Sequence, residues 1–117
     1  MDLKAVEHGD ADLRKNTLRF VYSALYLATK TRPDIAFTVV MMAACVANPP
    51  EIIISHLDRL FGYLQHTPSR GVVFGAKNTN LMLMADVAYA IHPDGKSHTG
   101  IVISMGGSPV AIRSSKQ

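Results

Sequence analysis

Residues 66–71, His-Thr-Pro-Ser-Arg-Gly, mark the point where the apolar pattern of the chain changes. Before this stretch, apolar residues recur every three or four positions, which predicts helices. After it, short apolar runs alternate with clusters of turn residues, which predicts strands. Helices followed by strands indicate an α+β protein, with three helices followed by an antiparallel β-meander.

On the N-terminal side, the helical spacing begins at Leu13 and is clear in Leu18, Val21 and Leu25. Thr31-Arg-Pro-Asp34 has the features of a helix start, with Thr31 as the cap and Pro33 in the first turn. The helix that it opens, about 34–47, is apolar nearly all round, so we expect it to be central or sandwiched.

A second start signal, Asn48-Pro-Pro-Glu51, opens a third helix of about 50–65, with Asn48 as the cap. The apolar stripes of the helices predict one shared core. We expect its members to be Ile35, Phe37, Val40, Leu57, Phe61 and Leu64.

On the C-terminal side, the apolar runs predict strands at 72–74, 81–85, 99–104 and 110–113. Gly106-Gly107 predicts a tight hairpin turn between the last two. The chain therefore divides into a loose leader (1–12), a helical region (13–70) and a β-region (71–117).

The composition sets limits on the class of protein. The chain has 117 residues, of which 48% are hydrophobic and 18% charged, with a net charge of +3. This balance excludes intrinsic disorder. A single cysteine, Cys45, excludes an internal disulfide framework and a cysteine-based zinc site. We expect no membrane span and an intracellular protein, cytoplasmic or nuclear.

Asp86 is the one ionisable residue with a suggestive position, at the end of the apolar run Leu81-Met-Leu-Met-Ala85. A carboxylate there could bind magnesium, or it could simply cap the turn that follows. The five histidines show no ligand spacing, although His92 and His98 flank a Pro-Gly loop. Ser114 and Ser115 have no evident base partner.

A series of short segments resembles the Ty1/copia-type retrotransposon polyprotein, at the connection between its reverse transcriptase and its ribonuclease H. The segments, in the family's order, are Ser23-Ala-Leu-Tyr-Leu27, Thr31-Arg-Pro-Asp-Ile-Ala-Phe37, Asn48-Pro49, Arg59-Leu-Phe-Gly-Tyr-Leu64, Thr67-Pro68, Ala85-Asp-Val-Ala-Tyr89, Asp94-Gly-Lys-Ser-His-Thr-Gly100, Gly106-Gly-Ser-Pro109 and Ser114-Ser-Lys-Gln117. The resemblance implies a partial ribonuclease H-like fold.

The same resemblance implies that Asp86 is a vestigial catalytic residue, matching the first carboxylate with which the complete enzyme binds magnesium. The chemistry needs a cluster of carboxylates to hold two metal ions, and after Asp86 the only acidic residue is Asp94. We therefore expect no cofactor and no ribonuclease H or polymerase activity for this chain alone.

The resemblance leaves three function classes open. The chain is an inactive fragment of a retrotransposon polymerase, a co-opted (domesticated) binding or regulatory protein that uses the remnant fold, or a nuclease completed by another chain. Asp58 and Gly62 stand where the family is basic, so we expect nucleic-acid binding to be weak and non-specific, if it occurs. The apolar strand at 81–85 predicts a partner that covers the sheet, either a second copy in a homo-oligomer such as a dimer or another protein.

Overall fold

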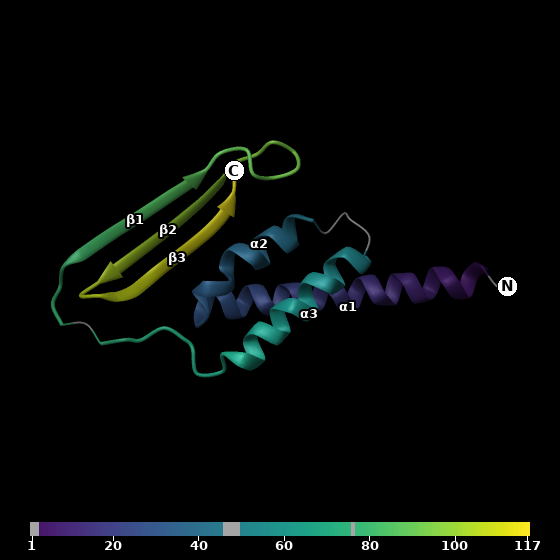
Figure 1. Ribbon diagram of the computed structural model, residues 1–117, viewed down its shortest axis with the longest axis horizontal. Coiled ribbons are helices and arrows are strands. Elements are labelled where there is room, and N and C mark those ends of the chain that lie inside the picture. The colour runs from purple at the N-terminus through teal and green to yellow at the C-terminus, as the bar shows by residue number, and fades with distance from the viewer. Residues whose placement is uncertain (1–2, 46–49, 76) are drawn as a thin grey trace.

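The computed structural model describes residues 3–45, 50–75 and 77–117 of the chain. The elements follow the order α1 (Leu3–Lys30), η1 (Pro33–Ile35), α2 (Ala36–Ala44), α3 (Pro50–His66), β1 (Leu81–Ala88), β2 (His98–Met105) and β3 (Ser108–Lys116) (Figure 1). Three helices thus precede a three-stranded antiparallel sheet, and the predicted α+β class is confirmed.

The first helix is longer than the apolar spacing predicted. It begins at Leu3 rather than Leu13, so most of the expected leader is helical. Leucine, alanine, glutamate and lysine, which supply much of this segment, favour helix even without an apolar stripe. Lys30 in the last turn interacts favourably with the carbonyl end of the helix dipole. The division of the chain at 12 and 70 stays a prediction.

The second helix starts in a different way from the prediction. A 3-10 turn, Pro33–Ile35, precedes α2, and the residue in the cap position is Arg32, which makes no side-chain cap bond. The prediction of Thr31 as the cap is therefore wrong. The predicted cap of the third helix, Asn48, lies outside the described residues.

Arg32 instead ties the start of α2 to the end of α3. Its guanidinium is buried and donates to both carboxylate oxygens of Asp34, at 3.0 and 2.8 Å. It also donates to the carbonyl and hydroxyl oxygens of Thr67, at 3.0 and 2.8 Å. The hydroxyl of Tyr63 donates to the same carboxylate. These bonds, led by those from Arg32, lower the pKa of Asp34 to about 2.

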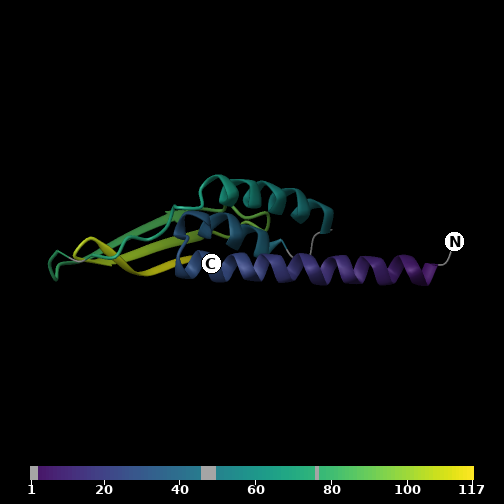
Figure 2. The same ribbon diagram turned by 90° about the horizontal axis from the view of Figure 1, so that it is seen from below.

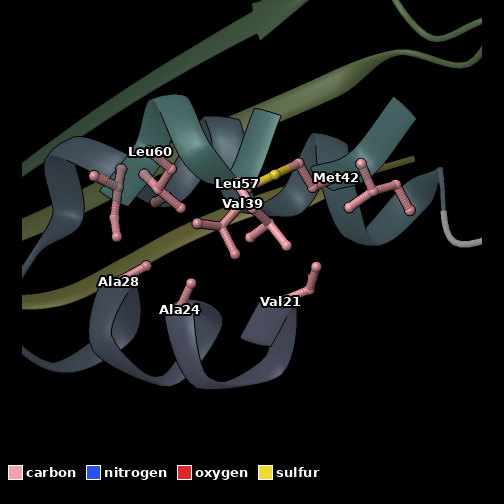
Figure 3. Packing of buried hydrophobic residues seen from close by; sticks show 10 residues of the cluster. Val21, Ala24, Ala28, Val39, Met42, Leu57 and Leu60 are labelled. Carbon is pink, nitrogen blue, oxygen red and sulfur yellow. The ribbon is translucent and has the colours of Figure 1, made fainter. Parts of the chain in front are cut away.

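The core lies between the three helices (Figure 3). Its buried members are Val21, Ala24 and Ala28 from α1, Ile35, Ala36, Val39 and Met42 from η1 and α2, and Ile53, Leu57 and Leu60 from α3. Of the predicted core, only Ile35 and Leu57 are fully buried, and Leu64 packs against the edge.

Phe37 and Phe61 were wrongly predicted as core residues. They are 49% and 37% exposed, respectively. Phe61 packs edge-on against Phe20 at the helix surface, and Phe37 faces the sheet. Both rings lie outside the cluster between the helices, which is filled by smaller side chains such as Val21, Val39 and Leu57.

The sheet is a meander with the strand order β1-β2-β3. The hairpin between β2 and β3 turns at Gly106 and Gly107, whose φ angles of 60° and 87° lie in the left-handed region. Two positive φ angles are what a two-residue hairpin turn needs, so the predicted turn is confirmed. The predicted strand at 72–74 does not form, and Val73 is 82% exposed without a strand partner.

The helices lie beside β3, at one edge of the sheet, and leave β1 at the opposite edge. The helix α2 packs against α1 and against β3, which places it between the helical core and the sheet, as its all-round apolar pattern predicted. In Figure 1, β3 lies nearest the helices and β1 farthest from them. Figure 2 shows α1 and α3 on opposite sides of α2. The strand β1 is therefore a free edge.

Candidate functional site

The free edge strand β1 exposes apolar side chains on both of its faces. Its large side chains are between 52% and 72% exposed: Leu81, Met82, Leu83, Met84 and Val87. Asp86 is its only charged residue. A strand of this kind leaves a row of backbone N–H and C=O groups unpaired beside an uncovered apolar surface. It is the most conspicuous interaction surface in the described residues.

Strand pairing divides the sheet into two faces. Met84 of β1 lies opposite Val102 of β2, which lies opposite Ile112 of β3, and these side chains share the face toward α2, here called the inner face. Leu83, Ile103 and Ala111 form the equivalent row on the opposite, outer face. On the outer face, Leu81 and Leu83 are 72% and 66% exposed.

A row of polar side chains crosses the helix-side end of the sheet. The Nε2 atom of His92 lies 3.0 Å from Nδ1 of His98, and Nε2 of His98 lies 2.7 Å from Oγ of Ser114. Both histidines are buried, at 3% and 4% exposed. The ring of Phe37 from α2 packs edge-on against His98, with ring centroids 5.0 Å apart.

This arrangement favours the neutral form of His98. Burial lowers the pKa of His98, and the charge of His92 lowers it further. His98 is therefore uncharged at neutral pH and can accept or donate a proton through either ring nitrogen. The Nδ1 atom of His92 is buried without a hydrogen-bond partner among the described residues.

A hollow of about 340 Å³ opens on the inner face beside these groups. Gly100 forms its floor, between Asp86 of β1 and Ser114 of β3, which lie opposite Gly100 on its two neighbouring strands. A Cβ atom added to Gly100 would meet nothing within 4 Å. Phe37 and Ala36 of α2 line the other side of the hollow.

Asp86 lies inside a strand and not at its end, because β1 continues to Ala88. Its side chain is exposed and faces the hollow. Within residues 3–45, 50–75 and 77–117, no three histidine, cysteine, aspartate or glutamate side chains come close enough together to hold a metal ion. A magnesium site at Asp86 stays a prediction without a second ligand to support it.

The sequence did not reveal that Ser114 has a base partner. His98 and Ser114 are sixteen positions apart, and they meet only because β2 and β3 pair in a particular register. The hairpin turn at Gly106-Gly107 was a usable signal for this pairing. A β-bulge between Ile103 and Ser104 shifts the register by one residue, however, and no residue type in the sequence announced it.

None of the described helices is both long and apolar enough to cross a membrane. No model of a known protein family matches the chain, and no solved structure matches it. The ribonuclease H-like part of the predicted fold therefore has no structural support.

Among curated proteins, the chain is similar to the secreted RxLR effector protein 161 of Plasmopara viticola. The two are 30% identical over 102 residues, which make up 86% of this chain and 72% of the relative.

This relative contradicts four expectations. These are the resemblance to a Ty1/copia-type retrotransposon polyprotein, the function as a polymerase fragment with its co-opted and two-chain alternatives, the associated description as a domesticated transposable element, and the intracellular location. Several of the segments behind the resemblance lie in turns or just before a helix, such as Thr31-Arg-Pro-Asp34 and Gly106-Gly-Ser-Pro109. Unrelated proteins share such segments because the same backbone geometry requires them. The similarity over most of both chains instead shows that this chain belongs to the family of the secreted RxLR effector protein 161 of Plasmopara viticola.

Proposed function

We propose that this chain is a secreted effector that works by binding another protein, and that the free edge of β1 is its binding surface. The first part rests on the relative, which is described as a secreted effector. The second rests on the observation that the large apolar side chains of β1 are more than half exposed on a strand with an unpaired edge.

An edge strand binds protein by strand addition. An extended segment of the partner pairs with the free N–H and C=O groups. Side chains on the two faces of the sheet determine which sequences bind. In β1 the exposed leucines of the outer face and methionines of the inner face would pack against apolar residues of that segment. Methionine adapts its shape to different neighbours, which suits a surface that must fit a foreign chain.

In a pure preparation, a second copy of the chain is the available partner. A two-fold axis through Ala85 would pair two β1 strands antiparallel, with Leu83 opposite Val87 and Met84 opposite Asp86 of the second copy. In this register no like charges face each other. The result would be a continuous six-stranded sheet in a closed dimer.

We expect the purified chain to self-associate at micromolar concentration, and Leu83→Lys to return it to a monomer of 12.7 kDa. Leu83 is exposed on the outer face, so lysine is accommodated in the monomer, but its charge opposes a strand added beside it. Light scattering or sedimentation equilibrium measures the mass.

Tyr22→Lys is the matched control, since Tyr22 is a 59% exposed apolar residue on α1, away from the sheet. We expect this variant to associate as the wild type does. A wild-type chain that is monomeric at these concentrations, or dissociation caused equally by both variants, would contradict the role of β1.

Secretion is tested separately in the source organism. An antibody against the chain should detect it in the medium outside the cells, at a higher level than an intracellular marker protein released by lysis. Detection in the cell extract alone would contradict the effector proposal. The mass measurement would still decide separately whether β1 mediates self-association.

A further inference from the structure

We propose that Ser114 is a nucleophile with His98 as its general base, in a second site on the inner face of the sheet that hydrolyses small, uncharged, apolar esters. This inference goes beyond the proposed binding function and uses a different part of the molecule. It rests on three observations: the contact between Ser114 and His98, the orientation of His98 by His92, and the hollow that opens beside the serine.

The spacing of the three side chains is that of an activated serine. A distance of 2.7 Å from Oγ of Ser114 to Nε2 of His98 allows the imidazole to take the hydroxyl proton. For Nε2 to accept this proton, Nδ1 of His98 must carry the other one. It then donates to Nε2 of His92, at 3.0 Å. His92 thus fixes the ring orientation and tautomer of His98, as the third member of a catalytic triad does.

The hollow gives a reacting group access to the serine. Glycine at position 100 leaves open the space above the sheet between Ser114 and Asp86. The remaining lining is mostly apolar: Ala36, Phe37, Met84, Val102 and Ile112. At about 340 Å³ it lies at the small end of ligand sites. Apolar walls select a small apolar acyl group, and the carboxylate of Asp86 disfavours an anionic one.

The reaction balances without a cofactor. Oγ of Ser114 forms a bond to the acyl carbon while its proton passes to Nε2 of His98. The ester C–O bond then breaks, and the alcohol leaves with that proton. Water attacks the acyl carbon in the same way, giving its proton to His98. The bond from the acyl carbon to Oγ breaks, Oγ takes the proton back from Nε2 of His98, and the carboxylic acid leaves.

A small alkyl fluorophosphonate tests the nucleophile directly, because its phosphorus forms a stable bond to an activated serine and releases fluoride. We expect the folded chain of 117 residues to gain one adduct, located at Ser114 by peptide mass spectrometry. Ser114→Ala should abolish this adduct, and His98→Gln should slow its formation about 100-fold or more. The side chain of Ser115 lies on the outer face, so Ser115→Ala should be labelled at Ser114 at the same rate as the wild type.

Gly100→Val is the second variant and leaves Ser114, His98 and His92 untouched. Valine is well suited to a strand and meets no neighbour at its Cβ, so we expect the fold to persist, as checked by circular dichroism. Its side chain would fill the hollow, and labelling should fall at least tenfold. Labelling of Ser114 that is no faster than in urea, or that persists in His98→Gln or Gly100→Val, would overturn the proposal.

His92 is a positioning residue. Its effect on His98 is measured by the pH dependence of the rate at which Ser114 is labelled. His98 is faced by His92 from the loop, by Phe37 from α2, by Ser114 from β3, and by Lys116, its partner in β-strand pairing, which is salt-bridged to Asp94. Glutamine in place of His92 can still accept the bond from Nδ1 but carries no charge. The pH at which labelling is half-maximal should therefore rise in His92→Gln. An unchanged midpoint would show that His92 does not act on His98.

Discussion

Replacing Leu57 by alanine is expected to lower the free energy of unfolding by about 2–5 kcal/mol. Leu57 is 4% exposed and lies in the middle of α3, where it contacts the core between α1 and α2 (Figure 3). The variant loses the transfer free energy of the removed methyl groups and leaves a cavity that small neighbours such as Ala24 cannot fill. Urea unfolding followed by far-ultraviolet circular dichroism measures the change.

Phe61→Ala is the matched comparison on the same helix. The ring of Phe61 is 37% exposed and touches Phe20 at the surface, so its removal should cost clearly less than that of Leu57, although phenylalanine is the larger residue. Equal losses for the two variants, or a loss below about 0.5 kcal/mol for Leu57→Ala, would show that the core is not arranged as described.

The second large effect concerns Arg32. We expect Arg32→Ala to lower the free energy of unfolding by about 2–3 kcal/mol, because it removes charge-assisted bonds to Asp34 and Thr67 and leaves their oxygens without the buried donor. Arg32→Lys should recover only part of the loss, since an ammonium group cannot bond in the same forked geometry. Arg70→Ala, which removes one exposed bond to Tyr63, is the control and should stay within about 0.5 kcal/mol.

The Arg32 contact also has a pH signature. The pKa of Asp34 is about 2 in the folded chain, below its ordinary value of 3.8, so its stabilisation is complete above pH 3.8 and is lost as the pH falls toward 2. In Arg32→Ala the main cause of the shift is gone, and the free energy of unfolding should fall less steeply over this acid range than in the wild type. An identical slope in both proteins would assign the acid sensitivity to other carboxylates.

Local patterns in the sequence were sufficient to predict three helices followed by an antiparallel sheet, although they also predicted a strand at 72–74 that does not form. The spacing of apolar residues located α3 within one residue at its C-terminal end, and Gly106-Gly107 located the hairpin because only a turn with two positive φ angles suits two adjacent glycines there. The burial of individual side chains was harder to predict. Phe37 and Phe61 are apolar and correctly spaced, but spacing does not say which neighbour a side chain meets: Phe61 packs on Phe20 at the helix surface, and Phe37 packs on His98 of the sheet.

The Ser114–His98 contact could not be predicted for a different reason. Counting back from the hairpin turn in strict one-to-one pairing places His98 opposite Ser115, because Met105 lies opposite Ser108. The bulge shifts His98 to lie opposite Lys116 and so brings Ser114 onto the same face as His98. A shift of one residue exchanges the two faces of a strand, and bulges arise from packing that a single sequence does not display.

The attachment of the sheet to the helices by α2 and β3 has a consequence for the order in which the molecule opens. Hydrogen exchange in a protein proceeds through partial unfolding of its least supported segments. The strand β1 is bonded to a neighbouring strand on one side only, and α2 packs mainly on β3, so we expect the amide hydrogens of β1 to open at a lower free-energy cost than those of β2 and β3. A bound strand would protect those same amides, and the energy of binding would therefore stabilise the strand that has the least support in the free sheet.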